Sequence, residues 1–215
     1  MSLDSDGGGI VGLNPGKAKA DIEGINASVT ALQKNLVTAT SAFFGELTNL
    51  WYSPIAVEFG AKVLPLIKDI DNEIISFNDK TIAKCVAAFN RIASAHGTGS
   101  ISVSAGPYLM GDYSSMQEVG PDGAVGMKVD PTRVCMETYI SAISGVASAL
   151  SGVPDRIAFY DTDGSLASAC ATNISSLRGK IETAIATIRS MVEPQLTEEA
   201  QKIEQAAATA AGQMH

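Results

Sequence analysis

Residues 43–63 read FFGELTNLWYSPIAVEFGAKV and place an aromatic turn between two long apolar patterns. Ser53 is a residue type that caps a following helix, and Pro54 suits the first helical turn. On both sides of this turn, apolar side chains recur at three- and four-residue intervals, which is the spacing of amphipathic helices. The stretch therefore predicts a helical hairpin that turns at Trp51.

The two helices of this hairpin can be followed outward from the turn. The first is expected over residues 15–50, because Asn14 is a good cap and Pro15 tolerates the first helical position. The second is expected over residues 54–95, with a kink at Pro65 because proline removes a backbone donor. The apolar stripes are Ile22, Ile25, Val29, Leu32 and Leu36 in the first helix and Val63, Ile67, Ile70, Ile74, Phe77, Ile82, Val86, Phe89 and Ile92 in the second.

The second half of the chain repeats this pattern, which predicts a second hairpin. A helix is expected to open at Asp130-Pro131 and to end where Gly152-Val153-Pro154 interrupts it. The aromatic pair Phe159-Tyr160 then precedes a last helix, which is expected to break at Glu193-Pro194. The stripes of these two helices are Met136, Ile140, Ile143, Ala147 and Leu150, then Ile174, Leu177, Ile181 and Ala184.

Between the hairpins, residues 97–129 are rich in Gly, Ser and Pro and lack a helical period, so they read as a linker. The alternating segments Ser100–Ser104 and Ala124–Val129 are predicted to pair as a small β-hairpin. The expected organisation is a flexible N-terminus over 1–13, a first hairpin over 14–96, the linker over 97–129, a second hairpin over 130–193 and a C-terminal helical tail over 194–215.

The composition favours an all-α fold. Hydrophobic residues make up 46% of the chain, whereas 18% are charged and 6% are aromatic, which suits closely packed helices with small core side chains. A hairpin with one apolar stripe per helix cannot bury both stripes alone. We therefore expect two helical hairpins packed as an antiparallel four-helix bundle.

The charge of the chain limits its partners. A formal net charge of −8 and a pI of about 4.7 argue against binding to nucleic acid or to anionic lipid surfaces. No apolar run reaches the roughly 18 residues that would span a bilayer. The opening MSLDSDGGG also lacks the basic and apolar segments of a signal peptide for the general secretory route.

The sequence offers no catalytic or metal-binding pattern. Its histidines, His96 and His215, lack a nearby nucleophile and carboxylate, and no serine-hydrolase, zinc-protease or P-loop motif occurs. Cys85, Cys135 and Cys170 are widely spaced, which favours three buried thiols, with a bond from Cys85 to Cys170 or Cys135 as the alternative. We expect a protein that is not an enzyme and that uses no cofactor or metal.

The tryptophan turn resembles that of the WXG/ESX proteins, the small substrates of type VII secretion. These proteins are helical hairpins with Trp-x-Gly in the turn, and they pair as antiparallel dimers. Here the turn reads Trp51-Tyr52-Ser53, with Ser53 in place of Gly, and Phe59 lies near where the family often has an aromatic residue. The second turn carries Phe159 and Tyr160 instead of a tryptophan.

The resemblance implies a function in protein recognition. The chain would correspond to both protomers of the family dimer fused into one pseudo-dimer, with a monomer as the expected state. It would be cytoplasmic before export and secreted through the type VII route, with the secretion ATPase or a target protein as partner. Tyr108 and Asp112 match the Tyr-x-x-x-Asp/Glu pattern of the family's secretion signal.

Two other functions are compatible with the residues. One is a pore-forming or membrane-lytic helical bundle that inserts the 97–129 linker into a membrane, although Asp112, Glu118, Asp122 and Lys128 interrupt its apolar stretches. The other is a helical adaptor without a link to secretion.

Overall fold

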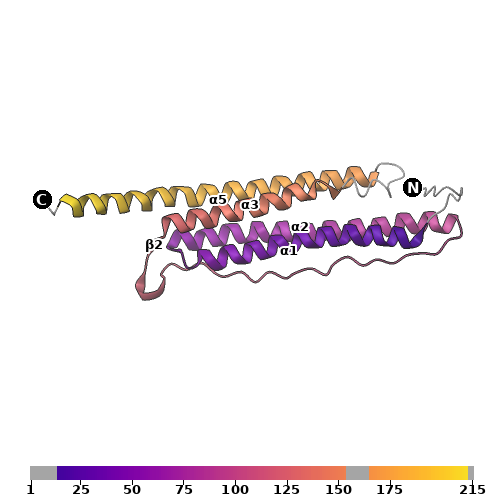
Figure 1. Ribbon diagram of the computed structural model, residues 1–215, viewed down its shortest axis with the longest axis horizontal. Helices are drawn as coiled ribbons and strands as arrows, with labels where there is room; N and C mark the ends of the chain where they lie inside the picture. Colours follow the sequence, from indigo (N-terminus) through magenta and orange to yellow (C-terminus); the bar gives the residue numbers. More distant parts are fainter. Residues whose placement is uncertain (1–13, 154–164, 213–215) are drawn as a thin grey trace. The chain divides into compact units, whose positions relative to one another are not determined.

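The computed structural model describes residues 14–153 and 165–212, which form four long helices (Figure 1). They are α1 (Pro15–Leu47), α2 (Pro54–Ala95), α3 (Val129–Leu150) and α5 (Ser165–Gly212). Two short strands, β1 (Trp51–Tyr52) and β2 (Gly126–Met127), and the 3-10 helix η1 (Pro121–Gly123) complete the described elements. The predicted all-α class is confirmed. Residues 1–13, expected to be flexible, lie outside the described part.

The helix boundaries follow from local capping. The Asn14 side chain accepts a hydrogen bond from the Lys17 amide at 3.1 Å, which caps α1. Helix α2 covers the predicted range, from Pro54 to Ala95, and passes through Pro65. Gly97 follows the helix end with φ +66°, and the Thr98 amide donates to the Ala93 carbonyl at 2.9 Å.

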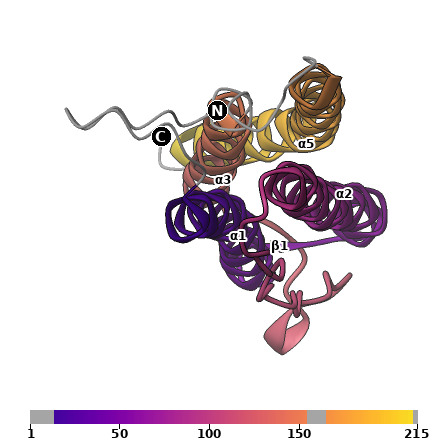
Figure 2. The ribbon, with the colours of Figure 1, turned by 90° about the vertical axis from the view of Figure 1, so that its right-hand side faces the viewer.

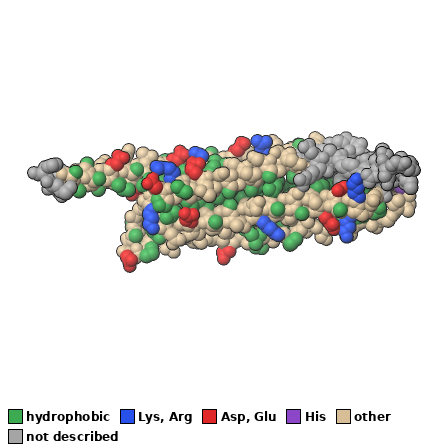
Figure 3. Space-filling model, in the orientation of Figure 1, with side chains coloured by type: hydrophobic (Ala, Val, Ile, Leu, Met, Phe, Trp, Pro, Cys, Tyr) green, Lys and Arg blue, Asp and Glu red, His purple; other side chains and the backbone are tan. Residues whose placement is uncertain are grey.

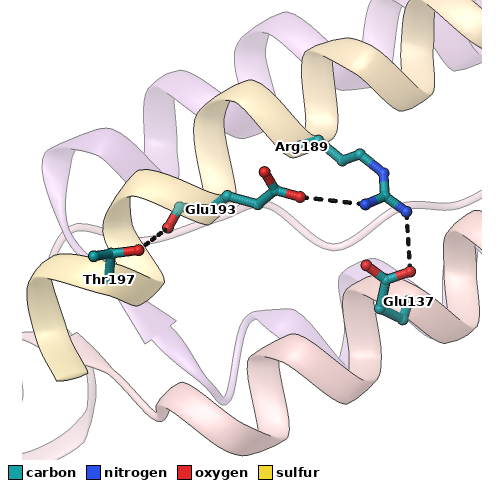
Figure 4. Close-up of polar contacts among 4 residues, drawn as sticks. All are labelled: Glu137, Arg189, Glu193 and Thr197. Carbon is teal, nitrogen blue, oxygen red and sulfur yellow. Dashed lines mark hydrogen bonds and ion pairs between the residues drawn. The ribbon is translucent and has the colours of Figure 1, made fainter.

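The expected break in the last helix is wrong, because α5 continues through Pro194 to Gly212. Val192 and Leu196, on either side of the proline, are both buried, so their packing offsets the missing backbone donor. Polar contacts also join Arg189, Glu193 and Thr197 of α5 with one another and with Glu137 of α3 (Figure 4). The Thr197 hydroxyl donates to the Glu193 carbonyl at 3.0 Å, and Arg189 binds the carboxylates of Glu193 at 3.3 Å and Glu137 at 3.1 Å.

The predicted apolar stripes form most of the core. Leu32, Val86, Ile92 and Ala147 are only partly buried, whereas the other stripe positions are buried. At these places the core contains the adjacent residues instead, which are Gln33, Cys85, Ala93 and Val146. Small shifts of this kind follow from the helical period, because adjacent positions share the edge of one face.

The chain divides into two compact units, and every long helix contributes to both. Among the described residues, the first unit comprises 14–35, 70–109, 145–153 and 165–179, and the second comprises 36–69, 110–144 and 180–212.

In the first unit, α1 and α2 run antiparallel. The Asn78 side chain donates to the Asn26 carboxamide at 2.8 Å, and the Gln33 side chain donates to Asp71 at 2.7 Å. Residue numbers therefore rise along α1 as they fall along α2. This direction agrees with the predicted first hairpin.

In the second unit, contacts join all four helices. Phe43 of α1 lies 6.1 Å from Phe59 of α2 and stacks on Tyr139 of α3 at 4.3 Å between ring centroids. Lys180 of α5 binds Asp69 of α2 at 2.6 Å. Arg189 of α5 binds Glu137 of α3.

The predicted hairpin within the linker is wrong. Strand β2 pairs instead with β1, antiparallel, with Trp51 opposite Met127 and Tyr52 opposite Gly126. Residues 100–104 form no strand, and there the Ile101 backbone bonds to the Asn90 side chain. The backbone of the turn between α1 and α2 is extended at Trp51, so its amide and carbonyl groups need hydrogen-bond partners. The end of the linker supplies these partners.

Cys85, Cys135 and Cys170 are buried thiols, so the alternative of a disulfide among them is wrong. A search of the described helices found none with both the length and the apolar character needed to cross a membrane.

Candidate functional site

Trp51 sits in an aromatic cluster of the second unit. Its side chain is 1% exposed, and its ring centroid lies 5.5 Å from that of Phe59. Phe59 also contacts Phe43 and Phe44 at 6.1 Å and 6.0 Å. The two aromatic positions taken from the family pattern are therefore in contact. Because Trp51 is buried, it can shape the turn but cannot offer its ring to a partner.

Ser53 caps α2 as predicted. Its hydroxyl oxygen accepts a hydrogen bond from the Ala56 amide at 3.0 Å, which satisfies one of the free donors at the helix start. Figure 2 shows β1 where the chain passes from α1 to α2. A serine can thus serve at the position where the resembling family has glycine.

The linker binds the backbone on both sides of the tryptophan turn, a contact that the sequence did not predict. The Lys128 amide donates to the Leu50 carbonyl at 2.9 Å, and the Ser53 amide donates to the Gln117 carbonyl at 3.3 Å. A side chain at Gly120 would collide with the Tyr52 ring, because an added Cβ would lie 2.7 Å from it. Gly120 is the sequence feature that could have predicted this contact, since glycine often marks a close approach of two segments.

Tyr108 of the predicted export signal is held by polar side chains of α2. Its hydroxyl donates to the Asp79 carboxylate at 2.6 Å and accepts from the Asn78 side chain at 3.0 Å. Burial, together with the hydrogen bond to Asp79, raises the pKa of Tyr108 to about 12. The hydroxyl is therefore protonated and occupied at neutral pH.

Asp112, the second residue of that signal, is exposed. Its backbone carbonyl accepts a hydrogen bond from the Ser41 hydroxyl at 3.2 Å. Tyr108 belongs to the first unit and Asp112 to the second, and the segment between them is not helical. Phe159 and Tyr160, the aromatic pair expected in the second turn, lie outside the described residues.

The buried thiols of Cys135 and Cys170 are unsuited to nucleophilic chemistry. Burial raises the pKa of Cys135 to about 12, with the nearby Glu46 adding to the shift, and raises that of Cys170 to about 11. Both remain protonated at neutral pH. Across residues 14–153 and 165–212, no group of three or more His, Cys, Asp or Glu side chains has the arrangement of a metal site.

One pocket of the first unit lies between α2 and α5. Its lining includes Glu73, Phe77 and Lys80 of α2 and Asn173 of α5, and its volume is about 240 Å³. Small-molecule sites are commonly larger, roughly 300–1,000 Å³, and mostly apolar. Its mixed polar lining does not select a ligand class.

Comparisons with models of protein families, with curated proteins and with solved structures found no match to this chain.

Proposed function

We propose that this chain is a non-enzymatic protein exported by type VII secretion, in which two WXG/ESX-like hairpins are fused. The observation that carries this proposal is the hairpin of α1 and α2, with Trp51 buried in its turn against Phe59. The tryptophan acts from inside the fold, as a structural residue that fixes the turn.

We extend the proposal to the packing of the whole chain as an antiparallel four-helix bundle. Its support is the set of interhelix contacts within the second unit, where α1 contacts α2 and α3, and α5 contacts α2 and α3. One chain would then supply both hairpins that the family obtains from two protomers.

The expected activity is protein recognition, with the secretion ATPase or a target protein as partner. Figure 3 shows acidic and basic side chains interspersed on the visible face, some of them side by side, without one large field of a single sign. Such a surface suits a specific protein contact better than electrostatic capture of a polyanion. Tyr108 and Asp112 are proposed as residues of the export signal.

Export by the native host tests this function. The amount of the full chain in the culture medium is compared between intact cells and a strain without the type VII ATPase, with a cytosolic protein as the control for lysis. We expect export that requires the ATPase and that falls in Tyr108→Ala. Equal retention in the cells of both strains would overturn the proposal and favour an intracellular adaptor.

A further inference from the structure

Three carboxamide side chains hold the linker by its backbone in the first unit. Asn26 of α1 donates to the Gly106 carbonyl at 2.8 Å, and its Oδ1 accepts from the Gly106 amide at 3.0 Å. Gln33 of α1 donates to the Leu109 carbonyl at 2.8 Å, and its Oε1 accepts from the Leu109 amide at 3.0 Å. Each side chain therefore binds both polar groups of one linker residue.

The third carboxamide side chain lies on α2. Asn90 donates to the Ile101 carbonyl at 3.0 Å and accepts from the Ile101 amide at 2.8 Å. We call residues 101–109 the strap, and Asn26, Gln33 and Asn90 its clamps.

The two α1 clamps bind linker residues in the same order along the chain. Asn26 binds Gly106 and Gln33 binds Leu109, so residue numbers rise together along α1 and along the strap. The strap therefore runs parallel to α1 over these contacts.

The strap is attached by polar contacts more than by apolar burial. Ile101 is buried, but Leu109 is 41% exposed and the adjoining Met110 is 84% exposed. Water can replace hydrogen bonds to carboxamides when a segment lifts, whereas the apolar core beneath remains packed. A segment with few buried apolar contacts belongs to the low-stability end of local opening.

The Asn26 clamp and Tyr108 belong to one connected network. The Asn78 side chain donates both to the Asn26 Oδ1 atom at 2.8 Å and to the Tyr108 hydroxyl at 3.0 Å. Gly106, the residue that Asn26 binds, has φ +90°, a conformation that favours glycine. Loss of the Asn26 clamp therefore removes support from the strap directly beside Tyr108.

We propose that the strap is a latch, and that its local opening makes the Tyr108 side chain available to the export machinery. This inference rests on the proposed type VII function. In the closed state, Asp79 and Asn78 occupy the tyrosine hydroxyl. In the open state, the side chain of Tyr108 leaves α2 while the helices stay folded.

Hydrogen exchange of the full chain tests the latch itself. The amides of Ile101, Gly106 and Leu109 each donate to a clamp, so their protection reports the closed state. We expect Asn26→Ala and Gln33→Ala to accelerate exchange at the strap about tenfold or more, with helix amides unchanged. No change at the strap would overturn the latch.

Two further variants show whether faster exchange at the strap comes from loss of a clamp or from general loss of folding. Asn49→Ala is the matched control, because the Asn49 carboxamide donates to the Gly45 carbonyl of the preceding turn and not to the strap. Asn90→Ala removes a clamp at a half-buried position, where truncation disturbs the core less. Strap exchange that accelerates in Asn90→Ala but not in Asn49→Ala supports the latch.

The gating role is tested by export of the same variants. We expect Asn26→Ala and Gln33→Ala to increase the amount of protein in the medium severalfold, and the increase to disappear in Tyr108→Ala backgrounds. ATPase-dependent export that is equal in wild type and clamp variants overturns gating but leaves the proposed function intact. Absence of ATPase-dependent export in all variants overturns the proposed function, and gating with it.

Discussion

At the scale of single residues, the turn between α1 and α2 depends on the burial of Trp51 and the capping by Ser53. The local signals for both were visible in the sequence, because a cap and a proline start a helix regardless of distant contacts. Gln33 was not foreseen. An amide beside the apolar stripe of a helix reads as solvated surface, and its burial follows only from a strap distant in the sequence.

The Ser53 cap yields a prediction about stability. Ser53→Ala removes the acceptor for the Ala56 amide and should lower the free energy of unfolding by about 1 kcal/mol. Ser53→Gly should cost only about a few tenths of a kcal/mol, because glycine suits a cap. Urea denaturation of both variants gives the comparison. Equal losses in the two variants would contradict the capping role.

Asp71 yields a prediction about pH. Burial raises the pKa of this carboxyl above its usual 3.8, while the hydrogen bond donated by Gln33 opposes the shift. The folded chain thus binds this proton more tightly than the unfolded chain. The contribution of Asp71 to the free energy of unfolding therefore falls as pH rises from 3.8 through the raised folded pKa, and stays low at neutral pH.

Asp71→Asn separates this effect from other titrations, since asparagine keeps an acceptor for Gln33 without the charge. We expect the variant to be more stable than wild type at pH 7, and the difference to shrink below pH 3.8. Urea denaturation across this pH range measures the difference. A difference that does not vary with pH would contradict the assigned cause.

At the scale of elements, periodicity predicted the long helices but not where the linker pairs. The apolar stripes through Ile22 and Ile67 are local repeats that can be read in the sequence, and the fold buries them in its core. The pairing of β2 with β1 depends on unsatisfied backbone at Trp51 and Tyr52, which has no local pattern. The helix break predicted at Pro194 is wrong for the opposite reason. The tertiary packing of Val192 and Leu196 outweighs the local tendency of proline to end a helix.

The proline in α5 yields a third stability prediction. Pro194→Ala restores a backbone donor within the helix and should raise the free energy of unfolding by about 1–3 kcal/mol. Thermal denaturation followed by circular dichroism measures the change. Thr197→Ala, which removes only a side-chain bond to the Glu193 carbonyl, is the control and should change stability by less than about 1 kcal/mol. A destabilised Pro194→Ala protein would contradict this account of α5.

At the scale of the whole molecule, each long helix contributes residues to both compact units. Continuous helices couple the folding of the segments that they join, so we expect cooperative unfolding. The cysteines report on this directly. Cys85 and Cys170 belong to the first unit and Cys135 to the second, and all three are buried.

Thiol labelling yields the corresponding prediction. Burial raises the pKa of Cys135 and Cys170, so the native chain should react slowly with a disulfide reagent at neutral pH. With a small amount of denaturant, all three thiols should react at the rate of global unfolding measured by circular dichroism. Single-cysteine variants identify each thiol. Early reaction of Cys135 alone would contradict cooperative unfolding of the two units.

We propose that one chain supplies both hairpins that the WXG/ESX proteins obtain from two protomers. Sedimentation equilibrium of the purified full chain over a wide concentration range is the measurement for this proposal. We expect a mass of 22.3 kDa throughout, because the apolar stripes of the four helices are buried within one chain. A stable species of about twice that mass at micromolar concentration would contradict it.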